Sequence, residues 1–230
     1  MSATAVNLSD STLHFWQTTV GKKAIMAVTG FILFGFVVGH LMGNLQIFEP
    51  PEKINHYSAL LKSLPALLWT ARITLLLSVG LHIWSSFELW LLQRQARPIN
   101  YVKKTNVNST YASRTMQWSG PIILAFVIFH LLQFTFGTVH PGAPFDEHNV
   151  YNNVVLGFQV WPVALFYIIA MTMLCYHLYH GLWSMFQSLG FSHPVYTPWL
   201  RLLAKVVAIL IAIGYISIPV AILAGLIKTV

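Results

Sequence analysis

Long apolar stretches separated by short polar joints form the main pattern of this 230-residue chain. Five stretches reach the roughly 20 apolar residues that an α-helix needs to cross a bilayer. We place these helices near residues 24–45, 67–92, 116–137, 160–188 and 203–227. Prolines mark the joints, as at Pro50-Pro51 and Pro98. The pattern predicts an all-α integral membrane protein with five transmembrane helices in a single domain, residues 1–230.

The composition agrees with a chain that mostly faces lipid. Hydrophobic residues make up 56% of the sequence and charged residues only 8%, whereas soluble domains carry about 25% charged residues. The single cysteine, Cys175, excludes a disulfide within the chain and a thiolate-held iron–sulfur cluster. The net charge of +7 does not indicate a nucleic-acid partner, because the basic residues cluster beside the predicted helices.

The distribution of Lys and Arg predicts the orientation in the membrane. Lys22 and Lys23 precede the first helix, and five basic residues lie within 94–114. The joints on the opposite side carry Glu49, Glu52 and other acidic residues. The positive-inside rule therefore places the N-terminus in the cytoplasm and the C-terminus outside.

Four histidines, His40, His82, His130 and His177, lie one apiece in the first four predicted helices. An imidazole within hydrocarbon is costly, so an intramembrane ionisable residue indicates a functional site. With one cysteine available, a redox metal here must rest mainly on histidine nitrogen. We interpret the four residues as the axial ligands of two b-type haems, held in a four-helix bundle with the fifth helix peripheral.

Depth in the membrane sorts these histidines into two pairs. At a rise of 1.5 Å per residue, His40 and His130 fall roughly 5–7 Å to the outside of the midplane. His82 and His177 fall roughly 3–5 Å to the cytoplasmic side. The predicted pairs are His40 with His130 and His82 with His177, separated by roughly 10 Å in depth.

Nearby residues leave some choices open. His180 follows His177 by three residues on nearly the same helix face, and we rank His177 as the ligand. Gly35, Gly39 and Gly43 form a stripe beside His40. That stripe fits either the close approach of a flat macrocycle or ordinary packing of helices through small residues. We expect Glu88 and Arg72 to lie near helix ends, where their charged groups can reach water.

Together these residues resemble a known family, the bacterial single-chain, five-helix, di-haem cytochrome b subunit of succinate dehydrogenase and fumarate reductase. The resemblance covers essentially residues 20–228, and its strength is the order and spacing of all four histidine segments. Its most distinctive segment is the fourth, where Gly-Leu-Trp-Ser follows the histidine after three residues. The segments are Val38-Gly39-His40-Leu41, Gly80-Leu81-His82, Ile128-Phe129-His130-Leu131 and His177-Leu178-Tyr179-His180-Gly181-Leu182-Trp183-Ser184.

The resemblance implies a role in respiratory complex II and the tricarboxylic acid cycle. His40 and His130 would ligate the haem distal to the soluble subunits, and His82 and His177 the proximal haem. A flavoprotein subunit would carry out the dicarboxylate chemistry, and an iron–sulfur subunit would exchange electrons with the membrane chain. The expected substrate in the membrane is a quinone, with menaquinone as the expected species. The expected location is the bacterial inner (cytoplasmic) membrane.

Three further sites are expected around the haems. Candidates for quinone binding near the outer face are Glu49, Glu52, His56 and Tyr57. Ser113 and Arg114 are candidates for contact with a proximal haem propionate. The basic segment 94–114 is either a docking surface for the iron–sulfur subunit or a topology signal in contact with anionic lipid.

Three other functions fit parts of the pattern. The cytochrome b subunit of a membrane-bound hydrogenase, formate dehydrogenase or nitrate reductase also carries haem-ligating histidines on bundle helices. A membrane di-iron oxidase or desaturase would need several histidine boxes, and only the pair His177 and His180 is present. A transporter with histidines as proton relays would be colourless, and it leaves the two depths unexplained.

Overall fold

The structure is a computed structural model, and it describes residues 14–97, 99 and 109–230. These residues form seven α-helices and two short 3₁₀ turns, and no β-strand occurs within those ranges. The helices are α1 (Thr19–Asn44), α2 (Pro51–Lys62), α3 (Pro65–Ala96), α4 (Tyr111–Phe134), α5 (Val150–Gln159), α6 (Trp161–Ser188) and α7 (Thr197–Leu223). The 3₁₀ turns span Phe15–Gln17 and Leu45–Phe48.

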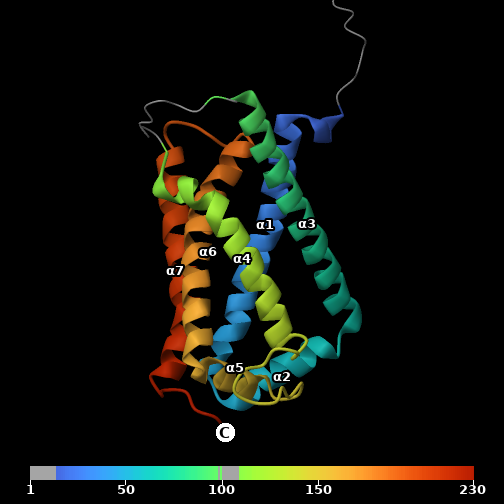
Figure 1. The fold of residues 1–230 in the computed structure, drawn as a ribbon, viewed down its shortest axis with the longest axis vertical. Helices are drawn as coiled ribbons and strands as arrows, with labels where there is room; N and C mark the ends of the chain where they lie inside the picture. The colour runs from blue at the N-terminus through green and yellow to red at the C-terminus, as the bar shows by residue number, and fades with distance from the viewer. Residues whose placement is uncertain (1–13, 98, 100–108) are drawn as a thin grey trace, which may run out of the picture.

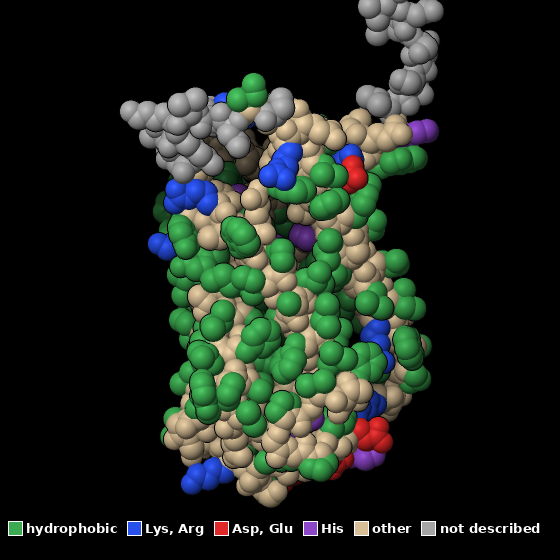
Figure 2. Space-filling view, in the orientation of Figure 1, with side chains coloured by type: hydrophobic (Ala, Val, Ile, Leu, Met, Phe, Trp, Pro, Cys, Tyr) green, Lys and Arg blue, Asp and Glu red, His purple; other side chains and the backbone are tan. Residues whose placement is uncertain are grey.

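Five of these helices are long and apolar enough to cross a membrane, namely α1, α3, α4, α6 and α7. The prediction of an all-helical membrane protein with five spans is therefore confirmed. Figure 2 shows apolar side chains over most of the visible face, with Lys and Arg mostly toward its two ends. Large side chains such as Leu76 and Leu210 are mostly exposed, as expected for a surface that contacts lipid.

The third span lies earlier in the chain than the predicted range 116–137. It begins at Tyr111 because the Thr110 hydroxyl caps the helix, accepting a hydrogen bond from the Ser113 N–H at 3.1 Å. It ends at Phe134, and the chain soon turns at Gly137, whose φ of 65° is a conformation that glycine adopts without strain.

The short helices α2 and α5 were not predicted from the sequence. The Pro50-Pro51 pair, which we read as a break, also starts a helix, because proline suits the first position of α2. The side chain of Asn149 caps α5 by accepting from the Asn152 N–H. The two helices are joined by Asn55, whose side-chain oxygen accepts from the Tyr151 N–H at 3.0 Å.

The two ends of the bundle differ (Figure 1). One end, here called the N-terminal end, holds the start of α1, the end of α3 and the start of α4. The other, the C-terminal end, holds α2, α5 and the end of the chain. The last residues bond to α5 there, since Tyr151 donates to the Lys228 carbonyl and Asn152 to the Val230 carbonyl, both at 3.1 Å.

The spanning helices pack in a defined order. α3 lies on α1, α1 on α6, α4 on α6, and α7 covers the other side of α6. Within the described residues, α3 and α4 do not pack against each other in this way. The helices that carry the four histidines therefore form an arc open between α3 and α4, and α7 lies outside that set.

A partly buried ion pair holds α1 to α3 near the N-terminal end. The Lys22 ammonium lies 2.8 Å from a carboxylate oxygen of Glu88, and the Lys22 side chain is only 9% exposed. The Glu88 side chain is 35% exposed, in keeping with the expectation that a charge near this helix end can reach water. The ion pair adds a partner that was not predicted, and it lowers the cost of placing Lys22 inside the bundle.

Candidate functional site

The structure brings the four histidines together as two pairs. The rings of His40 on α1 and His130 on α4 have centroids 5.7 Å apart, at an interplanar angle of 83°. The rings of His82 on α3 and His177 on α6 have centroids 6.2 Å apart, at 55°. These are the same pairings that depth along the chain predicts. In Figure 2 the face is hollowed toward the N-terminal end, and a histidine side chain is visible in the hollow.

The two pairs lie farther apart than predicted. His82 contacts Thr29 and Met26 on α1, while His40 lies more than ten residues farther along the same helix. On α6, His177 and the Tyr167 that contacts His130 are ten residues apart. At 1.5 Å per residue α6 gives a separation of about 15 Å along the bundle, and α1 gives about 17–21 Å. The predicted value of roughly 10 Å was smaller because each depth was measured from the middle of a predicted helix, and the predicted helix ends differ from the observed ones.

The separation within each pair fits a metal ion between two imidazoles. A metal–nitrogen bond is about 2 Å long, so two rings on opposite sides of one ion have centroids about 6 Å apart. Both observed separations are close to that value. The donor set, two nitrogens per site, also suits the two axial positions of a haem iron.

Hydrogen bonds orient the ring of His82. Its Nδ1 lies 3.1 Å from the Met26 carbonyl and 3.2 Å from the Thr29 hydroxyl oxygen. The Thr29 hydroxyl donates to the Ile25 carbonyl at 2.7 Å, so it can accept from the ring. Both neighbours therefore favour a proton on Nδ1, which leaves the Nε2 lone pair free for a metal.

The same logic applies to His177. Its Nδ1 lies 3.3 Å from the hydroxyl oxygen of Ser119, a residue of α4 with no exposed surface. Ser119 donates to the Met116 carbonyl at 3.5 Å, so its oxygen can accept the Nδ1 proton. One buried hydroxyl thus orients this ring and leaves Nε2 available.

His130 is oriented by a tyrosine. Its Nδ1 lies 3.3 Å from the Tyr167 hydroxyl, which donates to the side-chain oxygen of Gln133 at 2.9 Å. Tyr167 is 6% exposed and Gln133 is fully buried. The sequence offered one signal for this network, since Gln133 is a polar residue one helical turn after His130.

His40 is held by aromatic contacts. Phe36 stacks on its ring at a centroid distance of 5.2 Å, and the Tyr215 ring lies 6.4 Å away. Hydrogen bonds to its ring nitrogens are absent within the described ranges, and so are bonds to Nε2 of the other three histidines. The Nε2 atoms of all four rings are therefore free to bind a metal.

The structure separates the two interpretations of the glycine stripe. A Cβ on Gly43 would lie 2.8 Å from the Tyr57 ring, so this glycine lets α2 pack on α1. Gly35 and Gly39 have no neighbour that a Cβ would meet within 4 Å. The glycine that approaches a histidine is instead Gly30, whose Cβ would lie 3.3 Å from Cε1 of His82.

His180 is not part of either pair. Its ring meets Trp183 edge-on at 6.4 Å, and its buried Nδ1 has no hydrogen-bond partner among the described residues. Groups of three or more His, Cys, Asp or Glu side chains that could hold a metal are also absent from the described part of the chain. This geometry disfavours the clustered histidine boxes of a di-iron site.

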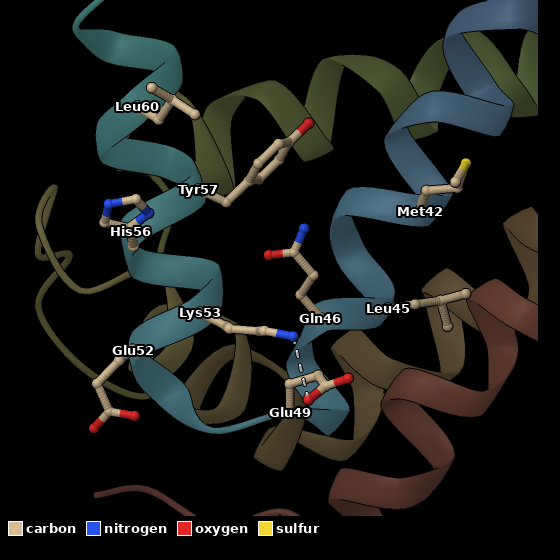
Figure 3. A pocket seen from close by; sticks show the side chains of 9 residues that line it. All are labelled: Met42, Leu45, Gln46, Glu49, Glu52, Lys53, His56, Tyr57 and Leu60. Atoms are coloured by element: carbon tan, nitrogen blue, oxygen red, sulfur yellow. Dashed lines mark ion pairs between the residues drawn. The ribbon is translucent and has the colours of Figure 1, made fainter.

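The four quinone candidates line one hollow of about 700 Å³ at the C-terminal end, between the end of α1 and α2. In Figure 3 Tyr57 and Lys53 reach from α2 toward α1, whereas Glu52 and His56 lie on the neighbouring face of α2. Glu49 forms an ion pair with Lys53 at 3.6 Å. Sequence reasoning missed Gln46, whose amide points into the hollow between the two helices.

The propionate candidates lie in the first turn of α4. The Ser113 hydroxyl donates to the Thr110 carbonyl at 2.8 Å, and the Arg114 guanidinium lies 5.8 Å from the centroid of the Tyr111 ring. Both residues are at the N-terminal end, the end nearer the His82/His177 pair. Residues 98 and 100–108 of the expected docking segment 94–114 lie outside the described residues.

Comparisons of the chain with protein-family models, with curated proteins and with solved structures found no match.

Proposed function

We propose that this chain is the membrane-anchoring, di-haem cytochrome b subunit of a succinate:quinone oxidoreductase or quinol:fumarate reductase. The observation that carries the proposal is the presence of two histidine pairs at two levels of one helical bundle. Their ring centroids are 5.7 and 6.2 Å apart, close to the spacing for two ligands of one iron. The resemblance of the four histidine segments supplies the choice of enzyme.

In this proposal each histidine would offer its Nε2 lone pair to a haem iron. His82 and His177 would hold the haem nearer the N-terminal end, and His40 and His130 the haem nearer the C-terminal end. When bound, two such haems would supply reversible one-electron transfer between the iron–sulfur subunit and quinone. Hydrogen bonds at Nδ1 keep three of the rings in the form that binds metal.

The hollow between α1 and α2 is the proposed quinone site. Met42, Leu45 and Leu60 offer apolar contact to a quinone ring and tail, and the site opens beside the lipid-facing surface. Tyr57 and Gln46 carry polar atoms suited to quinone oxygens. Glu49, Glu52 and His56 are the groups that would exchange protons with the outside.

The N-terminal end is proposed to face the cytoplasm and the partner subunits, with the C-terminus outside a bacterial inner membrane. Lys22, Lys23 and the basic residues between α3 and α4 support this orientation. The iron–sulfur subunit would dock at this end, and the flavoprotein subunit would carry the dicarboxylate chemistry. His180, Ser113 and Arg114 would contact the proximal haem propionates from the same end.

The test is a haem count on the chain purified in mild detergent, with and without co-expressed flavoprotein and iron–sulfur subunits. We expect a b-type dithionite-reduced minus oxidised spectrum and two haems per chain by pyridine haemochrome. Co-purification of the partners, with quinone reduction driven by succinate, would distinguish this enzyme from a hydrogenase or formate dehydrogenase subunit. A colourless chain in the presence of all its partners would contradict the proposal and favour the transporter.

A further inference from the structure

His130, Tyr167 and Gln133 form a largely buried chain of three polar groups that runs from the His130 ring toward Gly157 of α5. His130 Nδ1 lies 3.3 Å from the Tyr167 hydroxyl, and that hydroxyl donates to Gln133 Oε1 at 2.9 Å. The other end of the Gln133 amide, Nε2, is buried and has no hydrogen-bond partner among the described residues. A buried donor without a partner is costly, so this orientation of the amide requires a compensating gain.

The form of His130 that binds metal supplies that gain. If Nε2 of His130 binds a metal, its proton is on Nδ1, and the Tyr167 oxygen must accept it. The Tyr167 proton is then donated onward, which requires an oxygen at Gln133. The opposite amide orientation would reverse both bonds, place the proton on Nε2 of His130, and block metal binding there.

Packing holds this arrangement in place. Phe126 and Phe158 meet the Tyr167 ring edge-on, at centroid distances of 5.0 and 4.8 Å. Gly157 on α5 leaves room for the Gln133 amide, because a Cβ there would lie 2.7 Å from its Nε2. The amide is therefore enclosed on the side opposite Tyr167.

We propose that Tyr167 and Gln133 are positioning residues that fix His130 in its metal-binding form and lower the reduction potential of the haem held by His40 and His130. This inference rests on the proposed function. An acceptor at Nδ1–H increases electron density at the ligating nitrogen, and a more basic ligand stabilises the oxidised iron. Tyr167 acts on the iron through His130 and does not touch it.

The experiment is a redox titration of both haems in the complete complex, followed by visible spectra, for Tyr167→Phe, Gln133→Met and the double variant. We expect Tyr167→Phe to raise the reduction potential of the haem held by His40 and His130 by about 59 mV. For a one-electron couple this corresponds to a change of about tenfold in the electron-transfer equilibrium. The other haem should keep its potential. Gln133→Met should give a smaller rise, and should add nothing in the Tyr167→Phe background, because its effect passes through the tyrosine.

Tyr215→Phe is the matched control. Tyr215 also lies beside a ligand of this haem, with its ring 6.4 Å from His40, but its hydroxyl donates to the Val37 carbonyl at 2.7 Å. Its loss should leave both potentials unchanged. If Tyr167→Phe releases haem, Gln133→Met decides the matter, since it keeps the Tyr167 ring and its packing.

The possible failures are distinguishable. Two haems per wild-type chain with unchanged potentials in Tyr167→Phe and Gln133→Met would overturn the positioning role and leave the proposed function intact. An equal shift in Tyr215→Phe would likewise overturn it, because general packing would then explain the effect. No haem in the wild-type complex would overturn the proposed function itself.

Discussion

The two histidine pairs have similar ring separations, but different contacts hold their rings in orientation. In the His82/His177 pair both rings are oriented by hydrogen bonds to the adjacent helix, from α3 to α1 and from α6 to α4. In the His40/His130 pair only His130 has such a bond, and His40 is held by aromatic contact alone. Equal spacing therefore does not mean equal constraint, and we expect His40 to be the ring most free to reorient.

The partners that accept from Nδ1 also differ in kind. The hydroxyls of Thr29 and Ser119 each donate to a backbone carbonyl one turn earlier in the same helix, so each hydrogen-bond chain ends at the backbone. Tyr167 instead passes its proton to a side chain, Gln133. A backbone acceptor cannot be lost by substitution, whereas a side-chain acceptor can be changed. The His40/His130 pair is thus the one in which the group behind the Nδ1 acceptor can also be changed by a single substitution.

The largest expected effect comes from removing a ligand in each pair. We expect His40→Ala and His82→Ala each to lower the haem content from two to about one per chain, because one axial bond is lost in each case. The two variants should lose different components of the dithionite-reduced spectrum. Pyridine haemochrome measures the total haem content of each variant. His148→Ala, at an exposed histidine, is the control and should keep both haems. Two haems and an unchanged spectrum in His40→Ala would contradict the ligand assignment.

A bulky residue at Gly30 should selectively disturb the His82/His177 pair. In Gly30→Val the added carbons would press on the His82 ring, since a Cβ there already lies 3.3 Å from Cε1. We expect haem affinity at this pair to fall about 10–100-fold, as for loss of an orienting partner. The measurement is haem retention during transfer to excess apomyoglobin.

Gly35→Val provides the matched control for that change. Gly35 lies about 140° around α1 from Gly30 at 100° per residue, and a Cβ there meets nothing within 4 Å. It should leave retention at the His82/His177 pair unchanged. Equal loss from both variants would show that valine in α1, and not pressure on His82, causes the effect.

The smallest expected effect comes from removing the hydroxyl acceptors of the two rings in the His82/His177 pair. Ser119 is the one described partner of His177 Nδ1, whereas His82 has both Thr29 and the Met26 carbonyl. We expect Ser119→Ala to weaken haem retention about tenfold, and Thr29→Ala to have little effect because the carbonyl remains. Retention kinetics measured on both variants test this order. The reverse order would mean that the hydroxyl of Thr29 is the acceptor that matters.

The sequence predicted the spans and the pairing of histidines better than the surroundings of each ring. Span prediction needs only apolar length, and the pairing needs only direction and rise, so His40, His82, His130 and His177 were sorted correctly without a structure. Partners at Nδ1 depend on how each helix is rotated about its axis. Ser119 and Tyr167 therefore could not be distinguished beforehand from other polar residues in the spans.

The unpredicted parts share a physical cause as well. α2 and α5 are short, and their sequences mix polar and apolar residues, so neither reaches the length that identifies a span. The side chain of Asn55 links these two helices and that of Asn149 caps α5, contacts that depend on the folded structure. Gln46 was overlooked for a similar reason, since the end of α1 determines that its amide turns into the hollow.

The division of each pair between distant helices also affects how the protein is made. His40 and His130 are brought by α1 and α4, and His82 and His177 by α3 and α6. A growing chain therefore has its first complete pair once α4 has entered the membrane, and its second only after α6. Tyr167 also arrives with α6. During biogenesis we expect the first pair to pass through a stage without its orienting tyrosine, which makes α6 insertion the step that completes both sites.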